Sequence, residues 1–576
     1  MICAARSLSR WCSSFNMAEW PAIPSPSSAT TRARGWLIAA LVFVLIRSLP
    51  NISYPIARDQ ATYCVIGQGL LDGKHLYIDF WDNRSPGLAY IYALIVKVLG
   101  THMWCVGLVD ILWLLVISYL LFRFTERYLG PGAAAVAVIV NASWHVWAGY
   151  WQAAQAESFL MVFVFASFFL MSGEGRGPRL RYFVAGLVFG AAFWTKYNSL
   201  AFLPLVALVP YVNTGGLDAT PRRLSLLIPW RRWLANCLVF AVGFGMVVGL
   251  VLTYFWGVGS WAAFVEDQFV VLPRYAAMAL ERTPHYWLYA VDKTTDLIGP
   301  WTEAATAVAL ILAWKLRDLK RLAPVVVAAA LGYASLAAQV RFHAYTFETC
   351  NPFFAMIWGY LGLKTYQALR TLACSFAARG WRVARVLVWV VFANLVVWPL
   401  PKQVLNVAAH YQALAAWWRQ GETFYASYPW PIVISHFADQ MRVISYLRKN
   451  VKPGEGVFVW GSEPLIYFLT GTRQPTRFVL NLPLVSPWSP PAWREEVVRD
   501  LKKSPPRFLV VARDDAIPYI AYHPWDSEEF LKLYPELATF ISDCYEPVEH
   551  LTNFEIYCRR RSTQARVPAS AESLLP

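Results

Sequence analysis

Charged residues are scarce in this chain. Of its 576 residues only 15% are Asp, Glu, Lys or Arg, whereas 57% are hydrophobic and the mean hydropathy is +0.39. A soluble globular protein carries about a quarter charged residues, so the composition excludes that class. We therefore expect a polytopic α-helical membrane protein.

The cysteines lack the spacing of a metal or redox site. The nine cysteines form no Cys-x-x-Cys pair, which argues against a zinc ribbon and a thioredoxin-like site. Cys544 and Cys558 both fall in the C-terminal segment and could form a disulfide, but spacing alone leaves the connectivity open. Gly461-Ser462-Glu463 follows a predicted strand without the glycine spacing of a phosphate-binding loop. Neither thiol chemistry nor a nucleotide loop is indicated.

Hydrophobic segments recur along the first 400 residues. A helix needs about 20 apolar residues to cross ~30 Å of hydrocarbon. No small-x-small cleavage site follows the first segment, so we expect it to remain as a helix and residues 1–35 to be a disordered cytoplasmic N-terminus. About eleven spans are predicted near residues 36–50, 104–122, 131–148, 156–172, 182–195, 198–212, 233–256, 297–314, 322–340, 350–367 and 383–400.

The positive charge follows this predicted topology. The formal net charge is +15. If the N-terminus is cytoplasmic, the inner connections carry the Arg and Lys clusters, which is the positive-inside distribution. A nucleic-acid site would instead gather basic and aromatic residues on one soluble face, so we expect no nucleic-acid partner. The inner clusters lie within residues 6–34, 123–127, 176–181, 222–232, 315–321 and 364–385.

The first outer loop, residues 51–103, is not simply polar. Segments 60–71 and 87–99 have helical apolar spacing, but they are short and interrupted for a membrane span. Two helices lying at the membrane interface fit this pattern best.

The composition changes from about residue 401. Residues 401–455 are interpreted as an irregular linker, and 456–560 as a small extracytoplasmic α/β domain with a largely parallel sheet, because strands alternate with helices there. This domain is expected to cap the site or guide the substrate, and 561–576 to be a disordered tail. The strands are predicted at 456–461 and 507–512, with a late edge strand at 554–558, and the helices at 463–469 and 493–503.

Two acidic residues lie where outer loops meet membrane helices. Asp59 follows the first span, and Glu157 opens the fourth span on the same side. An ionisable group at membrane depth is costly and is a functional candidate by default. The alternatives are an interfacial carboxylate paired with Arg58, and a helix N-terminal acid favoured by the helix dipole.

Four basic or potentially basic residues fall on the same predicted face. They are Arg84, Lys196, Arg341 and His343. Together they could contact a phosphate group at the membrane surface. Lys196 could instead extend its ammonium to the interface, and a lone histidine is more often structural. A carboxylate that takes a proton and several cations that hold a phosphate suit transfer from a phosphate-linked donor.

The segments around these residues resemble a known family. The loop from Tyr77 to Gly87 (YIDFWDNRSPG), Ala156-Glu157-Ser158, Thr195-Lys196-Tyr197-Asn198, and Arg341-Phe342-His343-Ala344-Tyr345 with Pro352 carry the likeness. They resemble GT-C fold polyprenyl-phosphate-sugar-dependent glycosyltransferases, in the group of protein O-mannosyltransferases and lipid A aminoarabinose transferases. The resemblance covers residues 36–400 in layout and is strongest over 54–100.

The resemblance implies a mechanism. The donor would be a sugar on undecaprenyl or dolichyl phosphate, transferred with inversion at the anomeric carbon. Asp59 would match the catalytic acid that activates an acceptor hydroxyl, and Glu157 the second acidic position. Arg84 would match the basic residue of the loop, which is usually a lysine before proline, and would bind the donor phosphate together with Lys196, Arg341 and His343.

The loop departs from the family pattern at the position before that basic residue. The usual acid is Asn83 here, and Asp82 is a possible substitute. We therefore expect no obligatory metal and no cofactor, and leave a divalent metal open. Arg58, Asp82 and Tyr345 complete the candidate site.

The leading hypothesis is therefore a cell-envelope membrane glycosyltransferase of mannosyltransferase-like type. Its partners would be the lipid donor, membrane lipids and an acceptor that is a lipid, a glycan or a protein. It would lie in an inner or plasma membrane, or the endoplasmic reticulum of a eukaryote, with an extracytoplasmic active site. The alternative is a transporter or flippase of a lipid-linked substrate, which would favour charges deep in spans and internal repeats, and neither is evident. A receptor anchored by the spans ranks last, because eleven spans exceed what anchoring needs.

Overall fold

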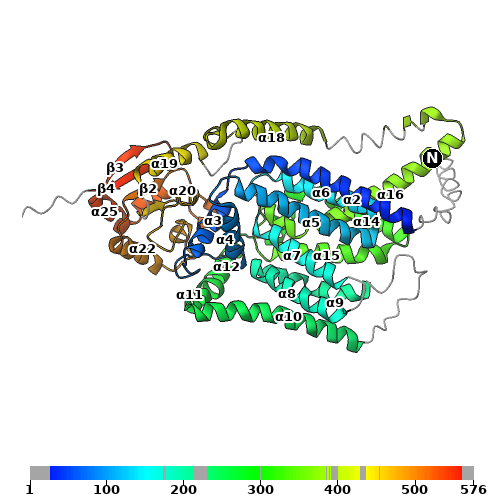
Figure 1. Cartoon of the computed structure of the whole chain (residues 1–576), viewed down its shortest axis with the longest axis horizontal. Coiled ribbons are helices and arrows are strands. Elements are labelled where there is room, and N and C mark those ends of the chain that lie inside the picture. The colour runs from blue at the N-terminus through cyan, green and yellow to red at the C-terminus, as the bar shows by residue number, and fades with distance from the viewer. Residues whose placement is uncertain are drawn as a thin grey trace, which may run out of the picture.

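The computed structural model describes residues 26–172, 177–212, 230–298, 300–384, 386–387, 390, 400–428, 436–452 and 455–560. Helices gather in a long bundle, and a small domain with a sheet lies at one end of it (Figure 1). The prediction of a helical chain with a small C-terminal α/β domain is confirmed. The predicted tail, 561–576, lies outside the described residues.

The bundle helices coincide with the predicted hydrophobic segments. Within the described residues, three helices are long and apolar enough to cross a membrane by themselves: Ala33–Ser53, Cys105–Leu129 and Trp233–Gly257. The count of about eleven spans stays a prediction, and its last segment, 383–400, lies largely outside the described residues. The bundle contains α2 (Pro26–Ser48), α5 (Cys105–Leu129), α6 (Pro131–Trp147), α7 (Ala156–Met171), α8 (Pro178–Thr195), α9 (Leu203–Val212), α10 (Trp230–Gly257), α14 (Pro300–Lys315), α15 (Leu319–Ala337) and α16 (Asn351–Ala378).

Local sequence explains where these helices begin and how closely they pack. Both α6 and α8 start with proline after a glycine, and proline suits the first helical turn because its missing N–H has no intrahelical partner there. Helices α8 and α10 approach closely at Gly186, where an added Cβ would lie 2.1 Å from the carbonyl oxygen of Phe240. Small residues permit such close contact between membrane helices.

The outer segments form short helices at the end of the bundle. Helices α3 (Arg58–Leu71) and α4 (Gly87–Leu99) confirm the two helices predicted for the first outer loop. The second large outer segment contains α11 (Trp261–Val265), the π-helix η3 (Glu266–Val271), α12 (Leu272–Glu281) and α13 (Tyr286–Ile298). Both groups lie on the side of the bundle that faces the small domain (Figure 1).

Two predicted irregular segments are helical instead. Helix α2 already begins at Pro26, so the expected disorder of 1–35 is wrong for residues 26–35, while 1–25 lie outside the described residues. The predicted linker 401–455 contains α18 (Leu400–Gln420), the 3-10 helix η5 (Gly421–Ser427) and α19 (Phe437–Asn450). Helix α18 lies along the bundle, and the Tyr411 hydroxyl donates to the Ile46 carbonyl at 2.6 Å. Tertiary contacts of this kind stabilise a helix that composition alone does not favour.

The sheet of the small domain is mixed. It has the order β1-β2-β4-β3, with β1 (Val457–Trp460), β2 (Phe508–Ala512), β3 (Tyr545–His550) and β4 (Phe554–Arg559). Only β1 and β2 pair in parallel, whereas β4 is antiparallel to both β2 and β3. The expected largely parallel sheet and edge position of β4 are therefore wrong, because β3, whose exposed and charged sequence lacks the pattern of a strand, pairs with the outer side of β4. Cys544 and Cys558 are both free.

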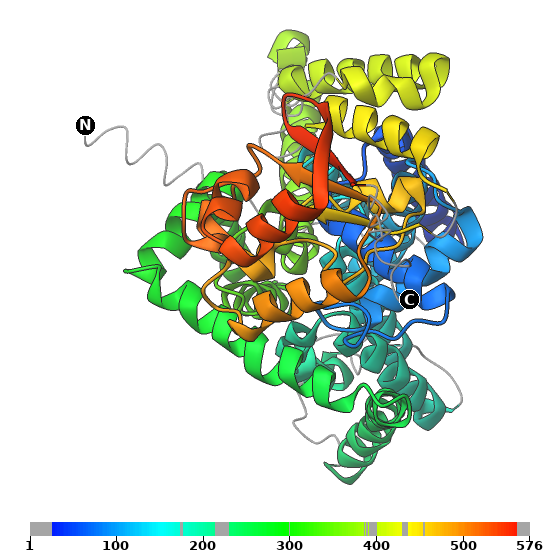
Figure 2. The same ribbon diagram turned by 90° about the vertical axis from the view of Figure 1, so that its left-hand side faces the viewer.

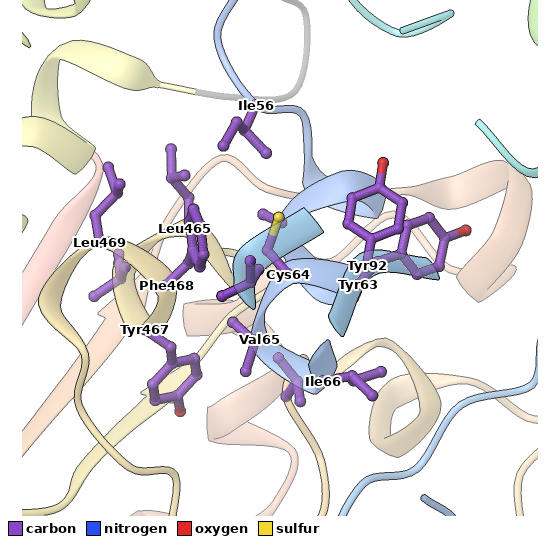
Figure 3. Packing of buried hydrophobic residues seen from close by; sticks show 14 of the residues in the cluster. Ile56, Tyr63, Cys64, Val65, Ile66, Tyr92, Leu465, Tyr467, Phe468 and Leu469 are labelled. Atoms are coloured by element: carbon purple, nitrogen blue, oxygen red, sulfur yellow. The ribbon is translucent and has the colours of Figure 1, made fainter. Parts of the chain in front are cut away.

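The small domain packs on the helix that opens the first outer loop. Helix α20 (Leu465–Thr470) and α3 share one hydrophobic core, in which Leu465 and Phe468 lie on the side of α3 that carries Cys64 and Val65 (Figure 3). Seen from its own end, the domain covers the end of the bundle (Figure 2).

Candidate active site

A cavity of about 660 Å³ lies between the end of the bundle and the small domain. Its wall comes from segments far apart in the sequence: α3, the loop before α4, the start of α7, the turn after α8, α12, η4 (Ala344–Thr349) and the small domain. All of the candidate site residues line it: Arg58, Asp59, Asp82, Arg84, Glu157, Lys196, Arg341, His343 and Tyr345. The structure brings the predicted set together, and their individual roles stay predictions.

The first ion pair joins α3 to the loop before α4. Asp59 lies in the first turn of α3, where a carboxylate is favoured by the helix dipole. Its Oδ1 lies 2.6 Å from Arg84 Nη2, and Arg84 Nη1 lies 3.1 Å from Asp82 Oδ1. Burial raises the pKa of the Asp82 carboxyl, and the neighbouring Arg84 guanidinium opposes that rise. The guanidinium also lies over the ring of Tyr63, with 4.8 Å between Cζ and the ring centroid. Arg84 is therefore held at the cavity wall from three sides.

Close backbone contact sets the position of this loop. Gly87 opens α4 directly after Pro86. A Cβ at Gly87 would lie 2.6 Å from the carbonyl oxygen of Trp194 and 3.0 Å from the amide nitrogen of Thr195. Only glycine lets the loop with Arg84 approach the end of α8, which leads into Lys196.

The second ion pair joins α7 to the turn after α8. Glu157 lies in the first turn of α7 and is 1% exposed. Its Oε1 pairs with Lys196 Nζ, whereas its Oε2 has no hydrogen-bond partner among the described residues. One carboxylate oxygen and one ammonium thus face each other at the cavity, beside the pair of Asp59 and Arg84.

The segment after α15 supplies the remaining predicted residues. His343 stacks on Tyr345, with 5.3 Å between the ring centroids. Burial lowers the pKa of His343 to about 4, and the nearby Asp59 carboxylate opposes that shift. Arg341 donates from Nη1 to the Tyr519 carbonyl at 2.5 Å and from Nη2 to the Tyr522 hydroxyl at 2.7 Å. Arg341 therefore binds the small domain in this structure.

Arg58 connects the small domain to the start of α3. Its Nε donates to the Ser462 carbonyl at 2.6 Å, and its Nη2 lies 3.4 Å from Glu463 Oε1. Burial raises the pKa of Glu463 to about 8, and Arg58 opposes that rise. The simple pairing of Asp59 with Arg58, which was the alternative to a functional Asp59, is not observed, since Asp59 pairs with Arg84.

Aromatic residues outside the predicted set line the cavity beside Arg341 and His343. Tyr275 of α12 packs edge-on against Trp488, with 5.3 Å between the ring centroids, and Tyr519 lies beside them in the cavity wall. No sequence signal could have selected them, because periodicity does not show which surface of the small domain faces the bundle.

Ionisable side chains also lie inside two bundle helices. Asp110 of α5 and His145 of α6 are buried and contact each other, with 3.0 Å between Oδ1 and Nε2. Asp110 lies in the second turn of α5 and His145 in the last turn of α6, so both are near the end of the bundle that carries the cavity, and the prediction that no charges lie deep within the spans stays a prediction. The signal was present, because an Asp or His inside an apolar segment is unusual. No group of three or more His, Cys, Asp or Glu side chains suited to a metal occurs in the described part of the chain.

Comparison with known proteins identifies the fold. A family model described as dolichyl-phosphate-mannose-protein mannosyltransferase matches residues 83–256, which include Arg84, Glu157 and Lys196. The crystal structure of ArnT from Cupriavidus metallidurans bound to undecaprenyl phosphate matches with a TM-score of 0.52 at 15% identity, over 93% of this chain and 99% of ArnT. A search of curated protein sequences found no match.

A more distant likeness is to an archaeal enzyme. The Archaeoglobus fulgidus oligosaccharyltransferase tethered to an acceptor peptide is 12% identical, with a TM-score of 0.47 over 91% of this chain and 74% of that one. The fold argument rests on ArnT alone. The predicted resemblance to GT-C fold polyprenyl-phosphate-sugar-dependent glycosyltransferases related to ArnT and the protein mannosyltransferases is confirmed. The family match points to glycosyltransferase activity in a membrane protein.

Proposed function

We propose that this chain is an inverting membrane glycosyltransferase that moves a sugar from a polyprenyl-phosphate donor to an acceptor hydroxyl. The observation that carries the proposal is the arrangement of two acid–base ion pairs, Asp59 with Arg84 and Glu157 with Lys196, on one cavity. The fold shared with ArnT, whose structure contains undecaprenyl phosphate, supports a lipid-phosphate donor.

Each ion pair contains a cation that the donor phosphate can bind in place of the carboxylate. A phosphate offers several anionic oxygens, and charge-assisted hydrogen bonds to Arg and Lys are among the strongest in proteins. When the phosphate binds Arg84 and Lys196, it competes with the two carboxylates for these cations. Asp59 is then released from Arg84 and becomes available to accept a proton. The resting pairs thus keep the cations in position without a buried, unpaired charge.

The transfer step uses Asp59 as the general base. The acceptor hydroxyl loses its proton to the Asp59 carboxylate while its oxygen forms a bond to the anomeric carbon. The bond from that carbon to the phosphate oxygen breaks, and the phosphate of the lipid leaves with the electron pair. Arg84 and Lys196 stabilise the charge that develops on the leaving phosphate. A single displacement of this kind inverts the anomeric configuration.

The aromatic part of the wall, beside Arg341 and His343, is the proposed acceptor side. Tyr275, Trp488 and Tyr519 present aromatic surface there, and two of the three come from the small domain. Enclosure by the domain excludes water and holds the acceptor near the donor, which lowers the entropic cost of the reaction. The cavity is proposed to lie on the extracytoplasmic side, because the alternate connections carry the Arg and Lys clusters of the cytoplasmic side.

Reconstituted protein tests the reaction class. Proteoliposomes are supplied with membrane extract and either a labelled polyprenyl-phosphate sugar or the corresponding nucleotide sugar. We expect label in an acceptor, or as free sugar by hydrolysis, only from the lipid-linked donor, and opposite anomeric configuration in donor and product. Use of the nucleotide sugar, or movement of intact lipid donor across the bilayer without cleavage, would overturn the proposal; the latter would favour a flippase.

A further inference from the structure

A buried cluster of ionisable side chains lies beside the cavity without lining it. Asp110 of α5, His145 of α6 and Glu348 of η4 are 1%, 6% and 8% exposed. Nε2 of His145 lies 3.0 Å from Asp110 Oδ1, and Nδ1 contacts Glu348 Oε1. Both ring nitrogens thus face carboxylate oxygens, an arrangement that suits a doubly protonated ring. The cluster joins two bundle helices to the segment that carries Tyr345.

Asp110 holds the backbone just before Glu157. Its Oδ1 accepts a hydrogen bond from the amide nitrogen of Ala154 at 2.9 Å. Ala154 has a φ of +50°, a left-handed conformation that is unfavourable for alanine. Its carbonyl accepts from the Tyr92 hydroxyl at 2.8 Å. Such a conformation persists only where the surroundings impose it, and Asp110 is one of the groups that impose it here.

Glu348 holds the side chain just after Glu157. Its Oε2 accepts a hydrogen bond from the Ser158 hydroxyl. The two carboxylates of the cluster therefore contact the chain on both sides of Glu157, at three residues before it and one residue after it. His145 lies between these carboxylates and offsets the repulsion that two buried negative charges would otherwise have.

We infer that Asp110, His145 and Glu348 form a clamp that fixes the backbone from Ala154 to Ser158 and so positions Glu157 against Lys196. His145 is a positioning residue in this arrangement, since neither it nor its two partners line the cavity. The expected effect on kcat rests on the proposed function, whereas the expected effect on the backbone from Ala154 to Ser158 does not.

Two serines of α7 provide a matched pair of variants. Ser158→Ala removes the hydrogen bond to Glu348, and Ser167→Ala removes a buried hydrogen bond to the Ala185 carbonyl further along the same helix. Hydrogen exchange of the full-length protein, measured by mass spectrometry on peptides that cover 151–160, reports on the clamp directly. We expect exchange there to rise on the order of tenfold in Ser158→Ala and His145→Gln but to stay unchanged in Ser167→Ala, because local opening follows the loss of local contacts.

Kinetics with the lipid-linked donor test the consequence for the reaction. In Ser158→Ala and His145→Gln we expect kcat to fall about 10- to 100-fold, because a displaced Glu157 also displaces Lys196, which stabilises the charge on the leaving phosphate. The KM for the donor should stay within about twofold of the wild type, since Arg84 still contacts the phosphate. Asp110→Asn, which keeps an oxygen for the Ala154 amide, should retain more activity than Asp110→Ala.

The outcomes separate the two claims. Unchanged exchange in Ser158→Ala and His145→Gln, or equal changes in Ser167→Ala, would show that no clamp exists. Normal kcat despite raised exchange would show that the clamp does not position Lys196 for the reaction. If the wild type transfers no sugar from any lipid-linked donor, the proposed function is wrong, and the exchange result still decides on the clamp. If His145→Gln fails to fold, Ser158→Ala alone carries the test.

Discussion

The guanidinium of Arg84 lies 2.6 Å from the carboxylate of Asp59 across the cavity wall. In the resting protein the proposed base is therefore neutralised by the proposed phosphate ligand. Binding of the donor phosphate to Arg84 would release Asp59, so the catalytic group becomes available only when the donor is present.

Replacing Arg84 tests this coupling. Arg84→Ala should raise the KM for the donor about 10- to 100-fold, which corresponds to the loss of about 1.5–3 kcal/mol for hydrogen bonds to a charged group. Arg84→Lys should recover a large part of that loss, because it restores the charge. Steady-state kinetics over a range of donor concentrations measures both. A KM that does not change in Arg84→Ala would place the donor phosphate elsewhere.

Substitutions in the ion pair of Glu157 and Lys196 should separate the effect on donor binding from the effect on stability. Lys196→Ala removes a proposed phosphate contact and also leaves the buried Glu157 unpaired, so it should weaken donor binding and lower the melting temperature together. Lys196→Ala combined with Glu157→Gln removes the unpaired charge, and the melting temperature should recover while donor binding stays weak. Thermal unfolding in detergent and binding of polyprenyl phosphate measure the two effects. Recovery of both in the double variant would contradict a phosphate contact at Lys196.

Gly87 should tolerate no side chain. Gly87→Ala places a methyl group 2.6 Å from the Trp194 carbonyl oxygen, which forces the loop with Arg84 away from the end of α8. We expect kcat/KM for the donor to fall about tenfold or more. Gly245→Ala in α10 is the control, since nothing lies within 4 Å of its added Cβ. Equal activity of the two variants would argue against a role of this contact in shaping the site.

A buried carboxyl outside the cavity should make stability depend on pH. Asp267 in η3 is fully buried, neither of its oxygens has a hydrogen-bond partner among the described residues, and burial raises its pKa to about 8. A raised carboxyl pKa means that the folded state binds the proton more tightly than the unfolded state. Asp267 thus costs the folded state about 1.4 kcal/mol for each pH unit above its ordinary pKa, until the pH reaches about 8.

Asp267→Asn should remove this dependence. The melting temperature of the variant minus that of the wild type should rise from pH 5 to pH 8 and then level off. Asp292→Asn, which changes an exposed carboxylate, should show no such trend. A constant difference between variant and wild type over this range would mean that Asp267 is already ionised in the folded protein.

The site residues that the sequence predicts are charged residues next to hydrophobic segments. Asp59, Glu157 and Lys196 lie at the ends of hydrophobic segments. The predicted topology puts these ends on the same side of a membrane. The same reasoning extended inside the segments would have found Asp110 and His145.

The strand order of the small domain and its packing on the bundle could not be predicted, for a different reason. The sequences of β1 and β2 are apolar throughout and predict strands, whereas β3 carries Glu546 and Glu549 and is largely exposed, and its neighbour in the sheet is β4 alone. Which face of the domain meets the bundle depends on contacts such as that of Arg58 with Glu463, which lie 405 positions apart in the sequence. A single sequence contains no signal for such a pairing, so the aromatic wall of the cavity could not be foreseen.

The most direct test of the account is sugar release from a labelled polyprenyl-phosphate sugar by the purified protein. It compares the wild type, Asp59→Asn and Asp72→Asn, the last of which changes an exposed carboxylate at the other end of α3. We expect transfer or hydrolysis by the wild type and by Asp72→Asn, and a loss of at least about 1,000-fold in Asp59→Asn with donor binding and melting temperature preserved. Undiminished turnover in a folded Asp59→Asn protein would contradict the central claim that Asp59 is the base.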